Sequence, residues 1–250
     1  MPDVYSFARQ PKWIAGHLLA GALLLAFAFA SVWQFSRHNE RVEEGNTVRA
    51  RATLQSLEAD ELFAEEPDDI QFRNANLDGT WLINDAVLIR NRSFDGNGGC
   101  HLVVPIGTRD RAVAVTVGWV GEVRCDLVSL EADLQALTAS AVSGRVRLTQ
   151  ERGSIGPKDA ADGRLPTFAR VDVERIDQQV SADLAPVYVE AIELTPAPAI
   201  DVQTLEAPAA DNGPHLGYAG QWLMFFLVGA VGYPLVLRRQ AHKGQAEHIS

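Results

Sequence analysis

Residues Ile14 to Phe35 read IAGHLLAGALLLAFAFASVWQF, an apolar run without a charged side chain. About 20 consecutive apolar residues are enough for a helix to cross the hydrocarbon core of a bilayer. A second uncharged run, LGYAGQWLMFFLVGAVGYPLVL, extends from Leu216 to Leu237. Its Pro234 lies near the end of the run, and membrane helices tolerate proline. The sequence therefore predicts two membrane-spanning helices, at residues 14–35 and 216–237.

Basic residues flank both runs on the sides that face the chain termini, at Arg9, Lys12, Arg238, Arg239 and Lys243. Because positively charged flanks tend to remain in the cytoplasm, we predict that both termini are cytoplasmic. The predicted protein is a multi-pass protein of the plasma membrane. Cytoplasmic tails at 1–13 and 238–250 then enclose an extracytoplasmic domain at 36–214.

One alternative concerns the first run. Ala28-Phe29-Ala30 has the small-x-small pattern of a signal-peptidase site, so the segment could instead be cleaved. The apolar run continues past this site through Val32 and Phe35, which gives it the length of a span and not of a short signal core. An uncleaved helix is the favoured reading, and sequencing the mature N-terminus distinguishes the two.

The charge composition and the motifs of the chain argue against nucleic-acid binding and against several classes of enzyme. The 250 residues include 22 Lys and Arg against 32 Asp and Glu, which gives a net charge of −10. Nucleic-acid-binding domains usually carry a basic footprint, so we expect a lipid bilayer and no nucleic acid among the partners. The chain lacks a Walker-type phosphate loop, a G-x-S-x-G elbow and an H-E-x-x-H motif. We therefore predict no catalytic residues.

Between the two runs the hydrophobic pattern is mainly that of β-strands. A Gly-rich polar loop is expected at 150–166, and a Pro- and Ala-rich extended linker at 195–214. Helical signal is limited to 128–137 and to the start of the domain at 39–61. The predicted fold class is two transmembrane helices flanking a mainly β, α+β extracytoplasmic domain. Its strands are expected at 81–90, 101–106, 112–119, 142–149, 168–176 and 187–194, with a hairpin loop at 107–111.

Cys100 and Cys125 are the two cysteines of the chain. Cys100 precedes one strand of the predicted hairpin and Cys125 follows the other, so the two ends could approach each other. A disulfide would be compatible with an oxidising compartment outside the cytoplasm. Two inert buried thiols are the alternative that the sequence leaves open.

Polar and aromatic residues gather where both predicted helices meet the outer membrane surface. Gln34 and Arg37 are three residues apart on the first helix and share a face, next to Trp33. His215, Tyr218 and Trp222 line one face at the start of the second helix. Antiparallel pairing of the helices would bring the two sets together. The close contact would then be made by small residues, at Ala22, Ala26, Ala30, Gly217, Gly220, Gly229 and Gly232.

His215 falls in the first helical turn, directly after Pro214, which suits a helix start. The positive end of the helix dipole disfavours an imidazolium ion, so His215 is expected to be neutral and able to bind a metal. An interfacial belt of His, Tyr and Trp without any ligand is the alternative.

These motifs resemble the Surfeit locus protein 1 family, most closely its bacterial members. The resemblance covers nearly the whole chain, from about Trp13 to Arg239. In one departure, Val117 stands where the family usually has arginine, so no role of that arginine applies here. The matching residues are Trp33-Gln34-x-x-Arg37, Phe72-Arg73, Leu88-Ile89-Arg90-Asn91-Arg92, Gly118-Trp119-Val120 and His215-Leu216-x-Tyr218-Ala219-x-Gln221-Trp222.

The resemblance implies an assembly factor for haem–copper cytochrome c oxidase, which is not an enzyme. Such a protein would assist haem A insertion or stabilise the catalytic subunit, with that subunit and the haem A synthesis and insertion proteins as partners. A permanent accessory subunit of an oxidase, with no cofactor of its own, is the alternative. His215 matches a family histidine linked with haem A binding and is the candidate iron ligand. The other candidate cofactor-binding residues are Tyr218, Trp222, Trp33, Gln34 and Arg37.

Overall fold

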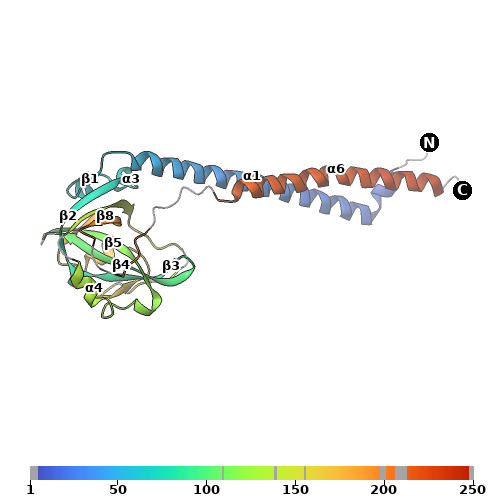
Figure 1. Ribbon diagram of the computed structural model, residues 1–250. Coiled ribbons are helices and arrows are strands. Elements are labelled where there is room, and N and C mark those ends of the chain that lie inside the picture. Colours follow the sequence, from blue (N-terminus) through green and yellow to red (C-terminus); the bar gives the residue numbers. More distant parts are fainter. Residues whose placement is uncertain are drawn as a thin grey trace. The chain divides into compact units, whose positions relative to one another are not determined.

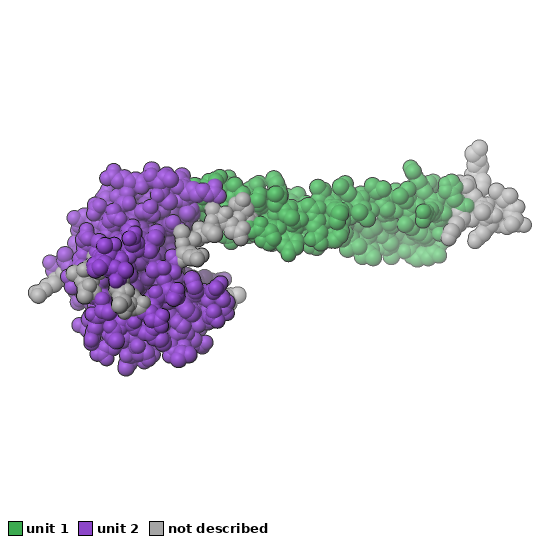
Figure 2. Space-filling view, viewed as in Figure 1, with its two compact units in different colours: residues 1–46, 210–250 green, residues 47–209 purple. Residues whose placement is uncertain are grey.

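The computed structural model describes residues 5–108, 110–137, 140–154, 156–197, 201–205 and 213–247. The chain forms two compact units (Figure 2). Residues 1–46 and 210–250 make the helical unit, and residues 47–209 make the barrel unit. Parts of the predicted 195–214 linker and both chain ends lie outside the described residues.

The helical unit consists of two long antiparallel helices (Figure 1). A short 3-10 helix, η1 (Ser6–Arg9), precedes α1 (Pro11–Ala52), whose last turns belong to the barrel unit. The second helix is α6 (His215–Glu247). Both helices are long and apolar enough to cross a membrane, and no described residue in the most apolar window of either helix is buried. Such exposed apolar surface is what a lipid-facing helix requires.

The contact face of the helix pair differs from the predicted stripe of small residues. Ala22 and Ala26 are exposed. A Cβ atom added at Gly217, Gly220 or Gly232 would meet no atom within 4 Å outside the backbone of its own helix. These five small residues therefore do not mediate the close approach, and the prediction was wrong for them.

Larger side chains make the contact instead, at spacings of three and four residues along α1. Phe27 stacks on Trp222 with ring centroids 5.8 Å apart, and Ser31 Oγ donates a hydrogen bond to the carbonyl oxygen of Ala219 at 2.9 Å. Gly229 is the exception among the glycines, because its added Cβ would lie 2.9 Å from Leu24. Spacings of three and four place these residues on one helix face, as in coiled-coil packing.

The barrel unit contains a mixed sheet that closes on itself. Its strands are β1 (Leu57–Glu58), β2 (Asn74–Trp81), β3 (Val87–Phe94), β4 (Asn97–Gly107), β5 (Arg111–Gly121), β6 (Ser140–Leu148), β7 (Thr167–Phe168) and β8 (Asp183–Thr195). In the described residues the strand order is β1-β2-β6-β8-β5-β4-β3-β7. Because β2 also pairs with β4, through Thr80 and Trp81, the strands β2, β6, β8, β5 and β4 form a ring.

Short helices connect and cover these strands: α2 (Glu61–Ala64), α3 (Pro67–Ile70), η2 (Ile83–Asp85), η3 (Glu122–Arg124), α4 (Glu131–Ala136) and α5 (Val173–Asp177). The predicted loop at 107–111 is the β4–β5 hairpin, and the helical signal at 128–137 corresponds to α4. The predictions of strands at 101–106, 112–119, 142–149 and 187–194 are confirmed in substance by β4, β5, β6 and β8. The helical signal at 39–61 is correct only as far as Ala52, where α1 ends.

Successive side chains along each strand point alternately into an inner and an outer hydrophobic core. Leu102, Val104 and Ile106 of β4 belong to a cluster that draws residues from every strand of the ring and fills its interior. Val103, between them, belongs to a second cluster on the outer side, together with Phe168 and residues of α5. A period of two residues thus gives each central strand two buried faces.

Two sequence predictions fail in the barrel unit. The strand expected at 81–90 is interrupted by η2, because the buried Asp85 carboxylate accepts hydrogen bonds from Ser181 and Arg164 and forms a corner there. The strand expected at 168–176 has only its first residue in β7, and its last four residues lie in the helix α5. Asp172 caps α5 by accepting a hydrogen bond from the backbone N–H of Arg175 at 3.1 Å.

Candidate functional site

Helix pairing brings one predicted pair of site residues into direct contact. His215 Nδ1 lies 2.9 Å from Gln34 Oε1, and both side chains are half-buried. Because an amide oxygen can only accept, this contact is a hydrogen bond when Nδ1 of His215 carries the proton. In this neutral tautomer Nε2 carries a lone pair, which is the form of histidine that binds metals.

The other four predicted residues are more dispersed. Trp222 lies on the paired face, two turns into α6, where it stacks on Phe27. Tyr218, one turn before Trp222 on α6, is 49% exposed. Trp33 is 47% exposed, and the guanidinium carbon of Arg37 lies 5.8 Å from the centroid of its ring. The structure thus brings His215 and Gln34 together, places Arg37 beside Trp33, and leaves Tyr218 exposed.

A surface hollow of about 420 Å³ lies beside His215. Its charged groups are the ion pairs Arg37–Glu40, at 2.7 Å, and Arg41–Glu44, at 3.1 Å. Sequence reasoning missed Arg41 and both glutamates, although the repeated Arg-x-x-Glu spacing on a continuing helix could have identified them. The hollow is lined by Trp33, Arg37, Glu40, Arg41, Glu44 and His215.

The residues at this site include a suitable iron ligand for a haem, but Arg37, which could bind a propionate, already pairs with Glu40. Nε2 of His215 would suit as an iron ligand, because the other ring nitrogen, Nδ1, faces the acceptor oxygen of Gln34. A porphyrin supplies its own equatorial nitrogens, so a single protein ligand is sufficient. The described residues contain no group of three or more His, Cys, Asp and Glu that could hold a bare metal ion. A propionate approaching Arg37 would compete with Glu40, so the hollow favours edge contact over enclosure.

Two further histidines of α1 lie on the contact face. His17 is hydrogen-bonded through Nδ1 to the hydroxyl of Tyr233, and its Nε2 lies 3.2 Å from the carbonyl oxygen of Ala8. Both nitrogens are therefore engaged in structural contacts. His38, one residue after Arg37, is half-buried, and its Nδ1 is buried without a hydrogen-bond partner in the described structure.

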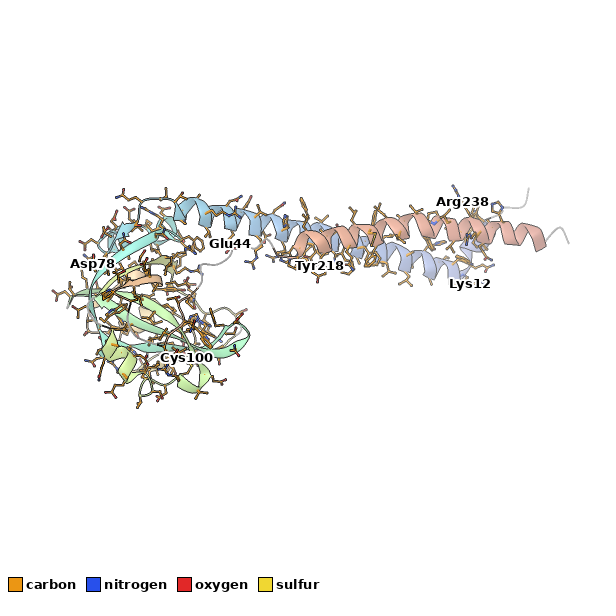
Figure 3. The ribbon with its side chains drawn as sticks, in the orientation of Figure 1. Lys12, Glu44, Asp78, Cys100, Tyr218 and Arg238 are labelled. Atoms are coloured by element: carbon orange, nitrogen blue, oxygen red, sulfur yellow. A yellow bond between two sulfur atoms is a disulfide. The ribbon has the colours of Figure 1, made fainter. Side chains whose placement is uncertain are left out.

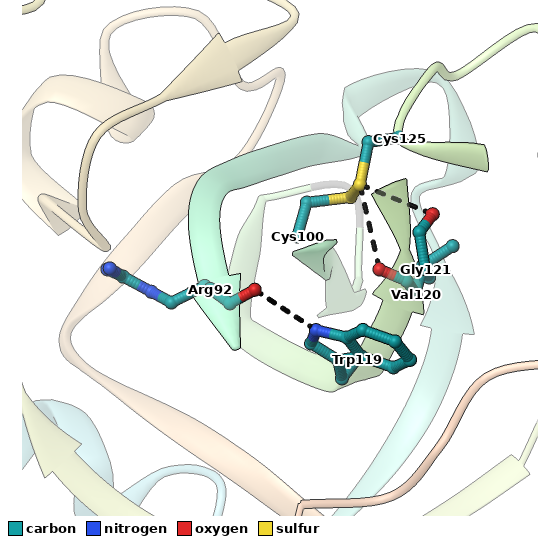
Figure 4. Close-up of a disulfide and its surroundings, with 6 residues drawn as sticks. All are labelled: Arg92, Cys100, Trp119, Val120, Gly121 and Cys125. Carbon is teal, nitrogen blue, oxygen red and sulfur yellow. Dashed lines mark hydrogen bonds between the residues drawn. A yellow bond between two sulfur atoms is a disulfide. The ribbon is translucent and has the colours of Figure 1, made fainter. Parts of the chain in front are cut away.

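In the barrel unit the structure joins Cys100 and Cys125 in a disulfide, with Cα atoms 5.8 Å apart (Figure 4). The bond ties β4 to the segment that follows η3. Beside it the indole N–H of Trp119 donates a hydrogen bond to the carbonyl oxygen of Arg92 at 3.2 Å. This network connects two of the strands on which the family resemblance rests.

Other residues of the resemblance motifs also have structural roles. Arg90 forms an ion pair with Asp159 at 2.6 Å, and Arg92 donates to Gln150 Oε1 at 3.1 Å, so both arginines hold the 150–166 loop. Gly118 lies where Gln203 approaches so closely that an added Cβ would be 2.3 Å from its carbonyl oxygen. Val117 is buried in the inner core.

Burial shifts the pKa of two groups on the outer side of the ring. It lowers the pKa of His101 to about 4, and the nearby positive charge of Arg92 acts in the same direction. Burial also raises the pKa of Glu190, against the opposing effects of Arg147 and Arg145. Glu190 also forms an ion pair with Arg147 at 3.7 Å.

This chain is similar to known proteins over most of its length. A model of the SURF1 family matches residues 22–227. Similar curated proteins include uncharacterized SURF1-like proteins of Mycobacterium bovis and of two strains of Mycobacterium tuberculosis. Each is 24% identical over 233 residues, which cover 91% of this chain and 84% of the relative.

Proposed function

This chain belongs to the SURF1 family, and on that premise we propose that it is a membrane-anchored assembly factor for haem–copper cytochrome c oxidase. The family match carries the proposal, since it takes in the whole barrel unit and part of both apolar helices. In this role the protein assists haem A insertion or stabilises the catalytic subunit, and it catalyses no reaction itself. Its partners are that subunit and the proteins that synthesise and insert haem A.

The proposed topology places both termini in the cytoplasm and the barrel unit outside the plasma membrane. Two features support it. Lys12 and Arg238 lie at the same end of the helix pair, as the positive-inside rule requires of two antiparallel spans (Figure 3). The Cys100–Cys125 disulfide suits an oxidising compartment and would be unusual in the cytoplasm.

Within this role we assign haem contact to the end of the helix pair where α6 begins. Support comes from His215, whose Nε2 is available for iron while Nδ1 is engaged by Gln34. Arg37 and Arg41, beside the same hollow, offer charge-assisted hydrogen bonds to propionates. Bound haem would supply the iron and the porphyrin, whereas the chain supplies one ligand and orientation.

The direct test is a visible spectrum of the detergent-purified protein, produced in cells that synthesise haem A. The proposal expects stoichiometric haem absorbance. It also expects a deletion strain without a second family copy to lose haem-containing oxidase while its oxidase subunits are still transcribed. Normal oxidase haem content in that strain would contradict the assembly role. Stoichiometric co-purification with active oxidase, without haem in the isolated protein, would instead indicate an accessory subunit.

A further inference from the structure

We propose that Gln34 is a positioning residue for His215: its amide oxygen selects the imidazole tautomer protonated at Nδ1 and thereby presents Nε2 as the metal-binding atom. The selection of the tautomer is a property of the protein alone. Its consequence for iron rests on the haem contact assigned under the proposed function.

The contact itself determines the tautomer. The 2.9 Å separation between His215 Nδ1 and Gln34 Oε1 is a normal hydrogen-bond length, and Oε1 has no proton to give. A proton on Nε2 instead would leave two lone pairs facing each other across this distance. The tautomer with Nδ1–H is thus favoured by the position of Gln34.

Contacts between the two helices hold Gln34 in place. One turn before it on α1, Ser31 Oγ donates to the carbonyl oxygen of Ala219 at 2.9 Å. Another turn back, Phe27 stacks on Trp222. The same face of α1 therefore contacts α6 on successive turns, and this packing limits how far the Gln34 oxygen can move from His215.

Such a partner changes the ligand as well as orienting it. A metal-binding histidine that donates its other N–H to an oxygen acceptor is fixed in rotation and becomes a stronger electron donor. Loss of the partner typically weakens metal affinity by about 10- to 100-fold. A carboxylate in place of the amide would strengthen the donation further and favour ferric over ferrous iron.

The first experiment needs no haem. Nitrogen-15 NMR of His215 in the full chain, in detergent, reports which ring nitrogen carries the proton. The wild-type protein should show Nδ1–H, and Gln34→Leu should lose this preference. Tyr233→Phe is the matched control, because it removes another hydrogen bond between α1 and α6, the one to His17, without touching Gln34 or His215. An unchanged tautomer in Gln34→Leu would overturn the proposal.

The second experiment titrates the same proteins with haem. Gln34→Leu should bind about 10- to 100-fold more weakly than wild type. Gln34→Glu should retain binding with a lower reduction midpoint, and Tyr233→Phe should match the wild type in both affinity and midpoint. Equal affinity and midpoint in all variants would overturn the role of Gln34 toward iron. Absence of haem binding in the wild type would refute the proposed haem contact and leave the NMR result as the test of the tautomer.

Discussion

The imidazole of His215 is the side chain on which the proposed haem contact depends. It is the histidine whose position combines a helix start, a half-buried ring and a hydrogen-bonded Nδ1. His17 has both nitrogens engaged by other groups, so it is a structural residue of the helix pair. The two histidines therefore have different roles, which depend on the groups that each imidazole ring contacts.

Replacement of His215 by alanine should abolish haem absorbance in the purified protein and leave membrane insertion intact, since the apolar residues of α6 are unchanged. His242→Ala is the control, because His242 is an exposed residue near the other end of the same helix. The measurement is the visible spectrum together with membrane fractionation. Full haem content in His215→Ala would mean that His, Tyr and Trp form only an interfacial belt.

His101 makes the stability of the protein depend on pH. Its pKa is about 4 in the fold, below the ordinary value of 6.5, because burial and Arg92 disfavour the imidazolium. The unfolded chain therefore binds the proton first, and stability should fall as pH decreases from about 6.5 to about 4. The loss amounts to at most about 3 kcal/mol.

His101→Gln removes this titration while retaining a polar side chain. Urea unfolding of the detergent-solubilised protein should then show a shallower loss of stability between pH 6.5 and 4 than in the wild type. Carboxylates titrate in both proteins, so the difference between the two curves isolates His101. Identical curves would show that the imidazole is not protected in the fold.

Among the elements, the β4–β5 hairpin and its junction with β2 decide whether the sheet closes. A Cβ at Gly107 would lie 2.3 Å from the carbonyl oxygen of Arg111 and 2.6 Å from the Cα of Ala112. Backbone atoms cannot move aside as a flexible side chain can. A Cβ added at Gly79, next to the Thr80 that pairs with Gly107, would lie 2.9 Å from backbone atoms of Gly107. The closure of the sheet therefore requires the backbones at Gly79 and Gly107 to lie close to their neighbours.

Gly107→Ala should lower the free energy of unfolding by about 1–3 kcal/mol, the usual cost of overpacking. Gly121→Ala is the matched control at the opposite end of β5, because its nearest neighbour is the Trp119 ring at an ordinary 3.6 Å. Denaturant midpoints of the two variants measure the difference. Equal midpoints would indicate that the hairpin relaxes without cost.

For the whole molecule, the disulfide and the basic helix ends make one joint prediction about topology. In intact spheroplasts, external protease should degrade the barrel unit and spare a tag at the C-terminus. Cys100 and Cys125 should resist a membrane-impermeant thiol reagent until a reductant is added. Removal of the C-terminal tag by external protease would reverse the proposed orientation.

Local sequence determined much of the architecture. Each apolar run is continuous, so its length alone predicted a helix able to span a bilayer. Strands β6 and β8 followed from the alternation of apolar and polar residues, and β4 and β5 from short β-branched runs bounded by turn residues. The polar strand β2 was missed, since its Asn74–Trp81 sequence has little β-branched or aromatic signal and depends on its partners.

Only the tertiary structure decided which faces and residues meet. Pairing of α1 with α6 uses Phe27, Ser31 and Gln34 and not the alanine stripe, because shape complementarity between two helices cannot be read from either one. Gln34 and His215 are separated by 181 positions in the chain, and no local pattern encodes their 2.9 Å contact. The same holds for β2 pairing with β4, which closes the barrel through residues distant in sequence. The sequence thus determined the residue types available at the helix ends, whereas the packing of two surfaces determined their partners.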